Sequence, residues 1–165
     1  MKKSLILLFV ALMTMSCAKK IYSIQNAAAS PEEAVLLFFK AIAAKNINEI
    51  NKYHFNKKEY IKIFHPEFRD YPSITSPMEA QEAWEIIDPR RRMGLQKILN
   101  NLQGKNIRSI EIKYKNGSPK TVGNLEAYFP SVIYVNTDRE KISIEEIGTI
   151  ISSNRKFKIA ILTTG

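Results

Sequence analysis

The sequence predicts an α+β fold in which N-terminal helices pack on a curved, C-terminal antiparallel sheet of about four strands, giving a cone-like domain. Two observations predict this class. As far as Leu102, apolar residues recur with the period of an amphipathic helix. From Ile107 onward they alternate with polar residues, which is the period of a half-buried strand. Helices followed by consecutive strands indicate an α+β rather than an alternating α/β fold.

The chain begins with the pattern of an export signal. Lys2 and Lys3 precede an unbroken apolar run over residues 5–13, which is too short to span a bilayer as a lasting helix. Small residues follow the run and flank Cys17, the only cysteine of the chain, which therefore has no internal disulfide partner. Residues 1–16 are predicted to be a signal peptide.

The motif Leu12-Met13-Thr14-Met15-Ser16-Cys17 resembles the lipobox of bacterial lipoproteins. In that family a peptidase cuts before the cysteine, whose thiol carries a diacylglycerol. Ser16 matches the small residue required before the cysteine, whereas the two residues preceding it depart from the usual pattern. The resemblance implies lipid attachment at Cys17 and a place in the bacterial cell envelope, on the outer membrane rather than the inner. The alternative is an ordinary signal peptide that is cut before Lys19 and leaves no lipid.

The rest of the chain is predicted to be one domain on a short tether. Residues 17–29 lack periodicity and are expected to form the lipidated tether. Residues 30–165 are expected to form the domain, which is long enough to bury a core without disulfides. The formal net charge is +9. The expected partners are the membrane through the N-terminal lipid, an anionic lipid or glycan surface, and an unidentified protein; nucleic acid is not expected.

Capping signals predict the first helices. Ser30 and Glu33 form a capping box for a helix over 30–44, whose broad apolar stripe indicates burial. Asn46 and Asn56 begin two short helices in the same way. Ile47 and Ile50 of the first are expected to face the core, and Pro66 is expected to stop the second. The domain is organised around the helix that follows Ser30.

Two more helices and four strand segments are predicted downstream. A start signal at Ser76 predicts a helix to about Ile87, and Asp88-Pro89 is expected to open another, which runs to Leu102. Gly104 suits the left-handed position after its end. The four strand segments are expected over 107–115, 125–135, 142–151 and 157–161, with an interruption at Pro130 and a kink at Gly148.

Both ends of the predicted domain carry a family resemblance. Pro31-Glu32-Glu33-Ala34 opens the first helix, residues 39–46 close it, and residues 48–53 continue as a short helix; the chain ends in the hairpin that contains Asn154 and Phe157. This order resembles small lipoproteins of the nuclear transport factor two-like (cystatin-like) superfamily, where a glycine and a tryptophan are common at the last two positions. The resemblance implies a cone of helices and curved sheet that often encloses a pocket. The superfamily includes enzymes, binding domains and assembly factors.

The sequence contains no motif for a metal or a cofactor, and neither is expected. Enzymes of the superfamily generally place a carboxylate or histidine with a tyrosine inside the cone. His54, His65, Asp70 and Asp88 are candidates of that kind, but each is explained by its local context. A catalytic role is therefore expected for none of them.

Two groups of side chains are candidates for binding. Arg90, Arg91 and Arg92 fall in the first turn of a predicted helix, where cations oppose the helix dipole, so they are a candidate anion-binding group. The alternative is a solvated helix face with one arginine paired to Glu82 or Glu85. Aromatic residues interleaved with lysines over 53–71 are a candidate pocket lid or membrane-facing surface, but core packing, with the lysine ammonium groups in solvent, is the favoured interpretation.

The predicted function is that of a lipid-anchored cell-envelope lipoprotein with a non-catalytic binding or scaffolding domain. The alternative is a small pocket enzyme of the same superfamily fold. A dry pocket with a perturbed ionisable group would favour the enzyme, whereas a filled cone would favour the scaffold. The side chains expected to line such a pocket are Phe38, Phe39, Tyr53, Trp84 and Tyr128.

Overall fold

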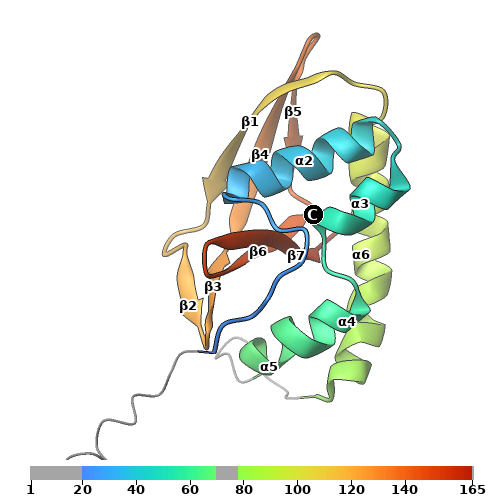
Figure 1. Cartoon of the computed structure of the whole chain (residues 1–165). Coiled ribbons are helices and arrows are strands. Elements are labelled where there is room, and N and C mark those ends of the chain that lie inside the picture. The colour runs from blue at the N-terminus through green and yellow to red at the C-terminus, as the bar shows by residue number, and fades with distance from the viewer. Residues whose placement is uncertain (1–19, 70–77, 165) are drawn as a thin grey trace, which may run out of the picture.

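The computed structural model describes residues 20–69 and 78–164, in which helices come first and antiparallel strands follow (Figure 1). The α+β prediction is therefore confirmed. The helices are α2 (Pro31–Ala43), α3 (Ile47–Tyr53), α4 (Lys57–Glu59), the π-helical turn η1 (Tyr60–Phe64), α5 (His65–Phe68) and α6 (Ala80–Leu102). The strands are β1 (Ile107–Tyr114), β2 (Lys120–Val122), β3 (Leu125–Tyr128), β4 (Pro130–Thr137), β5 (Lys141–Ile144), β6 (Ile147–Ser153) and β7 (Lys156–Leu162).

The strands form two antiparallel sheets rather than one sheet of about four strands. One is three-stranded in the order β1-β4-β5, and the other is four-stranded in the order β2-β3-β6-β7. The chain passes between the sheets just before Pro130, at the predicted interruption, and again between Ile144 and Ile147. Register shifts on both sides of Thr149 confirm a distortion of β6 at the predicted kink, Gly148. Each of two predicted strands is thus divided between the sheets.

Helix α2 lies across the molecule (Figure 1) and contributes two of the largest fully buried side chains. The Glu33 N–H donates to Ser30 Oγ at 3.0 Å, which caps the first turn. The Glu33 carboxylate accepts the N–H of Ala29 at 2.6 Å, one residue before the cap itself. Phe38 and Phe39 are both 0% exposed, so the broad stripe of this helix is buried on most of its circumference.

Pro66 does not stop the short helix that begins after Asn56, as had been expected. The chain widens into η1 just before it, and the His65 N–H donates to the carbonyl of Tyr60. A proline lacks the N–H of a regular helical bond, and the shifted bonding register lets the helix continue into α5 despite this loss. In α3 the outcome is mixed, because Ile50 is buried as expected but Ile47 is 70% exposed.

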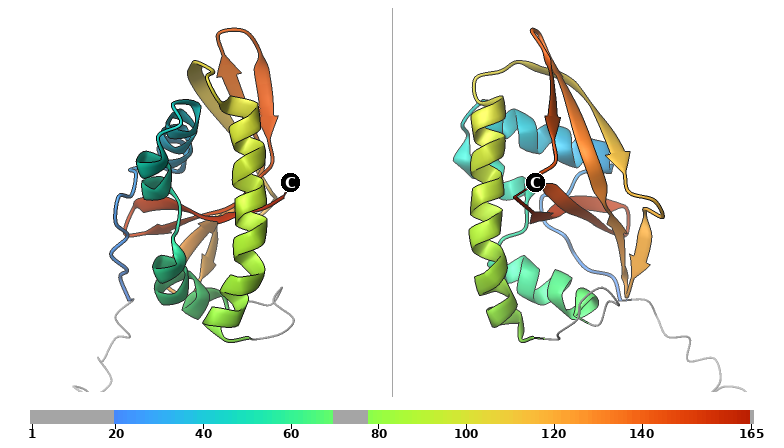
Figure 2. Two further views of the ribbon diagram at one scale, coloured as in Figure 1. Left: turned by 90° about the vertical axis from the view of Figure 1, so that its right-hand side faces the viewer. Right: turned by 180° about the vertical axis from the view of Figure 1, so that it is seen from behind.

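Helix α6 is one continuous helix, so the prediction that Asp88-Pro89 opens a new helix is wrong. Pro89 lies inside α6 and removes one backbone hydrogen bond. Burial along the length of the helix offsets this cost, because Ala83 near one end and Leu102 at the other both pack in the core. Figure 2 shows α6 running from α4 and α5 at one end of the molecule to β4 and β5 at the other. The predicted start signal at Ser76 lies outside the described residues.

The described residues from 20 to 29, expected to be tether, instead pack on the fold. The Tyr22 N–H donates to Ser153 Oγ at 3.0 Å, and Tyr22 is 8% exposed. Ala28 and Phe157 exchange two backbone hydrogen bonds of 2.9 and 3.0 Å. The segment is fixed because its apolar side chains alternate into the core, a pattern too short to stand out in the sequence.

Two hydrophobic clusters make up the core. The first surrounds α2 and holds Phe38 and Phe39, and the second gathers Phe55 and the aromatic residues of η1 and α5 against β3. Buried polar groups lie where the clusters meet. The ring of His54 lies 5.7 Å from that of Phe38 in the first cluster, and the Lys158 ammonium lies 5.8 Å from the ring of Phe55 in the second.

Candidate functional site

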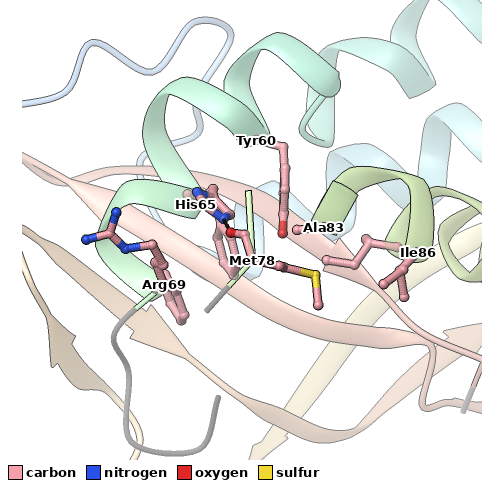
Figure 3. A pocket seen from close by; sticks show the side chains of 9 residues that line it. Tyr60, His65, Arg69, Met78, Ala83 and Ile86 are labelled. Atoms are coloured by element: carbon pink, nitrogen blue, oxygen red, sulfur yellow. Dashed lines mark hydrogen bonds between the residues drawn. The ribbon is translucent and has the colours of Figure 1, made fainter. Parts of the chain in front are cut away.

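An apolar pocket of about 250 Å³ opens between the η1–α5 segment and the first turns of α6 (Figure 3). Figure 3 shows the side chains of Tyr60, Met78 and Ile86 turned toward one another across it, while the guanidinium of Arg69 extends away. The lining residues come from both walls: Tyr60, Phe64, His65, Phe68, Arg69, Met78, Ala83, Ile86 and Ile87. The helical spacing of Tyr60, Phe64 and Phe68 brings their rings to one wall.

The aromatic wall is rigid because its rings stack on one another. The rings of Tyr60 and Phe64 lie 5.4 Å apart, and those of Phe64 and Phe68 lie 3.9 Å apart at an angle of 10°. Trp84 of α6 supports Tyr60 from behind at 5.4 Å. At the rim, His65 Nε2 lies within hydrogen-bond distance, 2.9 Å, of the Met78 carbonyl, which ties α5 to the residues before α6.

Tyr60 places a polar group in this apolar surrounding. Its hydroxyl forms no hydrogen bond within the part of the chain that the structure describes. Burial raises the pKa of Tyr60 to about 12, so the hydroxyl stays protonated at neutral pH and acts as a hydrogen-bond donor rather than a base. The pocket therefore suits an apolar group that carries a hydrogen-bond acceptor.

A second constellation is the buried histidine His54, which is 3% exposed. Arg91 Nη1 donates to His54 Nε2 at 2.9 Å, so Nε2 is the unprotonated nitrogen of the neutral ring. Nδ1 then carries the proton, and it has no hydrogen-bond partner within residues 20–69 and 78–164. Burial is the largest cause that lowers the pKa of His54 from 6.5 to about 4, and the charges of Arg91 and Lys158 contribute to the same shift. A histidine enclosed in this way remains neutral under ordinary conditions.

The charges next to His54 are each matched by a carboxylate. Arg91 donates through Nε and Nη2 to one oxygen of Asp88, at 2.9 and 2.7 Å. Lys158, whose side chain is 3% exposed, pairs with Glu59 at 2.8 Å and donates to a backbone carbonyl at 3.2 Å. A buried charge needs such a partner to offset its loss of hydration. These groups are therefore assigned a structural role.

The predicted pocket residues do not line one pocket. Phe38 and Phe39 are fully buried in the first cluster, and Tyr53 and Tyr128 pack against the same cluster. Trp84 packs on the second cluster. The interior at α2 is filled because the broad stripe of this helix meets side chains of both sheets, and the apolar pocket forms elsewhere, beside α6.

The predicted anion-binding group is also divided. Arg90, Arg91 and Arg92 lie in the middle of α6, so the argument from a helix start is wrong for them. Arg91 is committed to Asp88 and His54, and Arg92 pairs with Asp88 at 3.2 Å, rather than with Glu82 or Glu85. Successive residues point in different directions on a helix, and Arg90 alone of the three is exposed without a described ion pair.

In the aromatic and lysine-rich segment the structure shows the core packing, and one of its rings also lines the pocket beside α6. Phe55 and Tyr60 are buried in the second cluster, as in core packing, and Tyr60 also forms the pocket wall. The interleaved Lys57, Lys58 and Lys62 are exposed. Reasoning from the sequence missed Met78, Ala83 and Ile86 as the facing wall. Ala83 and Ile86 are three positions apart on α6, which was a usable signal, but nothing local connects them to Tyr60.

Cys17 and Asp70 lie outside the described residues. Within residues 20–69 and 78–164, no helix is long and apolar enough to cross a membrane. In the same part of the chain, no three histidine, cysteine or carboxylate side chains gather as a metal site would require. No protein-family model, curated protein or solved structure matches the sequence.

Proposed function

We propose that the chain is a lipid-anchored lipoprotein of the bacterial cell envelope, attached through Cys17, whose domain binds an apolar group of a ligand or partner without catalysing a reaction. The attachment follows from the signal-like leader and the single cysteine directly after it. The binding role rests on one observation, the apolar pocket that carries the unpaired hydroxyl of Tyr60.

Two further features favour binding over the alternative of a pocket enzyme. The region around Phe38 and Phe39 is filled by side chains. The buried ionisable groups His54 and Lys158 contact partners of the same chain. General acid–base catalysis needs a titratable group that faces a substrate, and Tyr60 keeps its proton at neutral pH.

The anchor is tested by replacing Cys17 in the full chain. Cys17→Ala should abolish incorporation of a labelled palmitate and leave an uncleaved precursor, because the modified thiol is the signal for cleavage in lipoproteins. Ser16→Gly keeps a small residue before the cysteine and is the matched control, with lipid retained. An intact mass that corresponds to a mature chain starting at Lys19 without lipid would contradict the proposal.

The pocket is tested with a fluorescent naphthalene sulfonate probe, which has an apolar ring system and hydrogen-bond acceptors. The wild-type chain should bind it saturably. Ala83→Leu adds a side chain inside the pocket and should abolish this binding, whereas Glu82→Leu adds the same side chain at an exposed neighbouring position and should not. Tyr60→Phe should weaken binding several-fold. Equal binding by the wild type and Ala83→Leu would rule out this pocket as the binding site.

A further inference from the structure

The N-terminal segment is fastened to three separate parts of the fold where the described chain begins. Beside the contact of Tyr22 with Ser153 on β6, the Lys20 N–H donates to Asn124 Oδ1 in the β2–β3 turn at 2.9 Å. The Tyr22 hydroxyl donates to the carboxylate of Glu67 in α5. Glu67 in turn accepts the Asn124 N–H at 2.7 Å. The start of the described chain is therefore a fixed point on the surface.

This junction is close-packed, so its geometry is specific. A Cβ atom at Gly123, in the β2–β3 turn, would lie 1.8 Å from Glu67 Oε2. Gly123 also has a positive φ of 56°, which favours glycine. The turn, α5 and the N-terminal segment consequently meet in one arrangement.

The fixed point lies close to the proposed lipid. Lys20 follows Cys17 by three positions, and a fully extended chain of that length spans at most about 10 Å. The polar layer on each side of a bilayer is about 5–8 Å thick. If Cys17 carries lipid, the surface around Lys20 lies at or beside the head groups, and a freely swinging domain on a long tether is excluded.

The surface at this point has the chemistry of a membrane contact. Lys20, Ile21, Asn124, Asn154 and Arg155 line a hollow of about 460 Å³ and are named here the N-terminal face. Lys20 and Arg155 are exposed and form no ion pair with any described residue, although the Lys20 ammonium lies over the ring of Tyr22, 4.6 Å from its centre. Ile21, next to Lys20 in the chain, is 69% exposed. Glu126 also reaches the hollow, and its carboxylate accepts a hydrogen bond from Tyr128 at 3.5 Å.

The hairpin that presents Arg155 turns through a two-residue loop in the left-handed region. Asn154 and Arg155 have positive φ angles of 50° and 57°, in the left-handed region. Asparagine tolerates this region, but arginine gains nothing from it locally, and glycine would relieve the strain.

We propose that the N-terminal face docks on the bilayer that holds the Cys17 lipid, with Lys20 and Arg155 on the phosphates of anionic lipid head groups and Ile21 in the interface. The inference rests on the proposed lipid anchor. The N-terminal face, rather than Arg90, Arg91 and Arg92 of α6, is then the surface that contacts anionic lipid, because Arg91 already binds Asp88 and His54. The proposed partner is a lipid surface. The test also shows whether a soluble anionic glycan binds instead.

The test uses the purified lipidated chain in nanodiscs of zwitterionic lipid, with and without anionic lipid. Hydrogen–deuterium exchange is followed in peptides that cover residues 20–22 and 152–156. Each cation facing an anionic surface favours contact by about fivefold, so exchange in these peptides should slow several-fold in the anionic discs. Added salt should remove the effect, because it screens surface charge.

Two charge-matched variants locate the contact. Lys20→Gln/Arg155→Gln should lose the slowing. Lys45→Gln/Arg139→Gln should keep the slowing, because neither residue belongs to the N-terminal face. The two variants are matched, because the control residues are also exposed cations without described ion pairs, and Lys45 shares the positive φ of Arg155. Figure 1 places the β4–β5 turn, which holds Arg139, at the end of the molecule opposite the first described residues.

Four results would overturn the docking proposal. Equal exchange rates in both kinds of disc would show that the N-terminal face does not bind anionic lipid. Equal slowing of exchange in both variants would show the same. Slowing only when a soluble anionic polysaccharide is added to zwitterionic discs would make a glycan the partner. An intact mass without lipid refutes the anchor itself and with it the docking, whereas a lipidated chain with unchanged exchange refutes the docking alone.

Discussion

Acidification should destabilise this protein through a single buried side chain, His54. The ring is enclosed, with Arg91 on Nε2 and Phe38 on one side. The charged groups around it are the cations of Arg91 and Lys158, whose carboxylate partners are Asp88 and Glu59. Protonating His54 adds a third positive charge at this place and would turn the acceptor of Arg91 into a donor, so the folded state resists it.

The size of the effect follows from the two pKa values. The pKa of His54 is about 4 in the folded state, against an ordinary value of 6.5. The unfolded chain therefore binds more protons than the folded chain between these limits. Stability is fully present above pH 6.5 and is lost as the pH falls toward 4. Between pH 7 and pH 4.5 the loss amounts to about 2–3 kcal/mol.

Urea unfolding of the purified chain at pH 7 and pH 4.5 measures this loss. Other groups also titrate over the same interval, so the comparison is with His54→Gln, which keeps an acceptor for Arg91 and does not titrate. The wild type should lose about 2–3 kcal/mol more than the variant between the two pH values. An equal loss in both proteins would refute the assignment of His54 as a buried neutral ring.

Three further substitutions test the packing by the same unfolding measurement. Phe39→Ala should cost about 3–5 kcal/mol because the ring is 0% exposed; a cost below about 1 kcal/mol would show that the site is not close-packed. Lys158→Met should cost about 3–5 kcal/mol by leaving Glu59 unpaired, and the double variant with Glu59→Leu should recover most of it; no recovery would mean that the pair is not the cause. Gly94→Ala should cost about 1–3 kcal/mol because its Cβ would lie 2.0 Å from the Thr163 carbonyl oxygen, and an unchanged midpoint would contradict that contact.

Local rules predicted the helix starts well. Ser30, Asn46 and Asn56 each accept the N–H of a residue three positions later. Gly104, expected in the left-handed position after a helix, has a φ of 71°. These signals succeed because the interacting groups are separated by a few bonds, so neighbouring residues alone decide the outcome.

The same local rules failed at the prolines and in the candidate site. Pro66 and Pro89 were expected to mark helix boundaries, but both lie within helical segments whose buried faces offset the lost hydrogen bonds. The pocket also escaped prediction. Its walls contain Tyr60 and Ile86, and no pattern in either segment specifies the other.

By itself the sequence determined the α+β class, the capped starts of the helices and the broad apolar stripe that places Phe39 in the core. The tertiary structure alone decided that residues 20–29 pack on the fold, that Arg91 turns inward to His54, and that the open pocket lies beside α6. Propensity, capping and periodicity act over one or two turns of chain. Which distant faces meet depends on the total apolar area that the whole chain buries, and this area is defined only once the elements pack together.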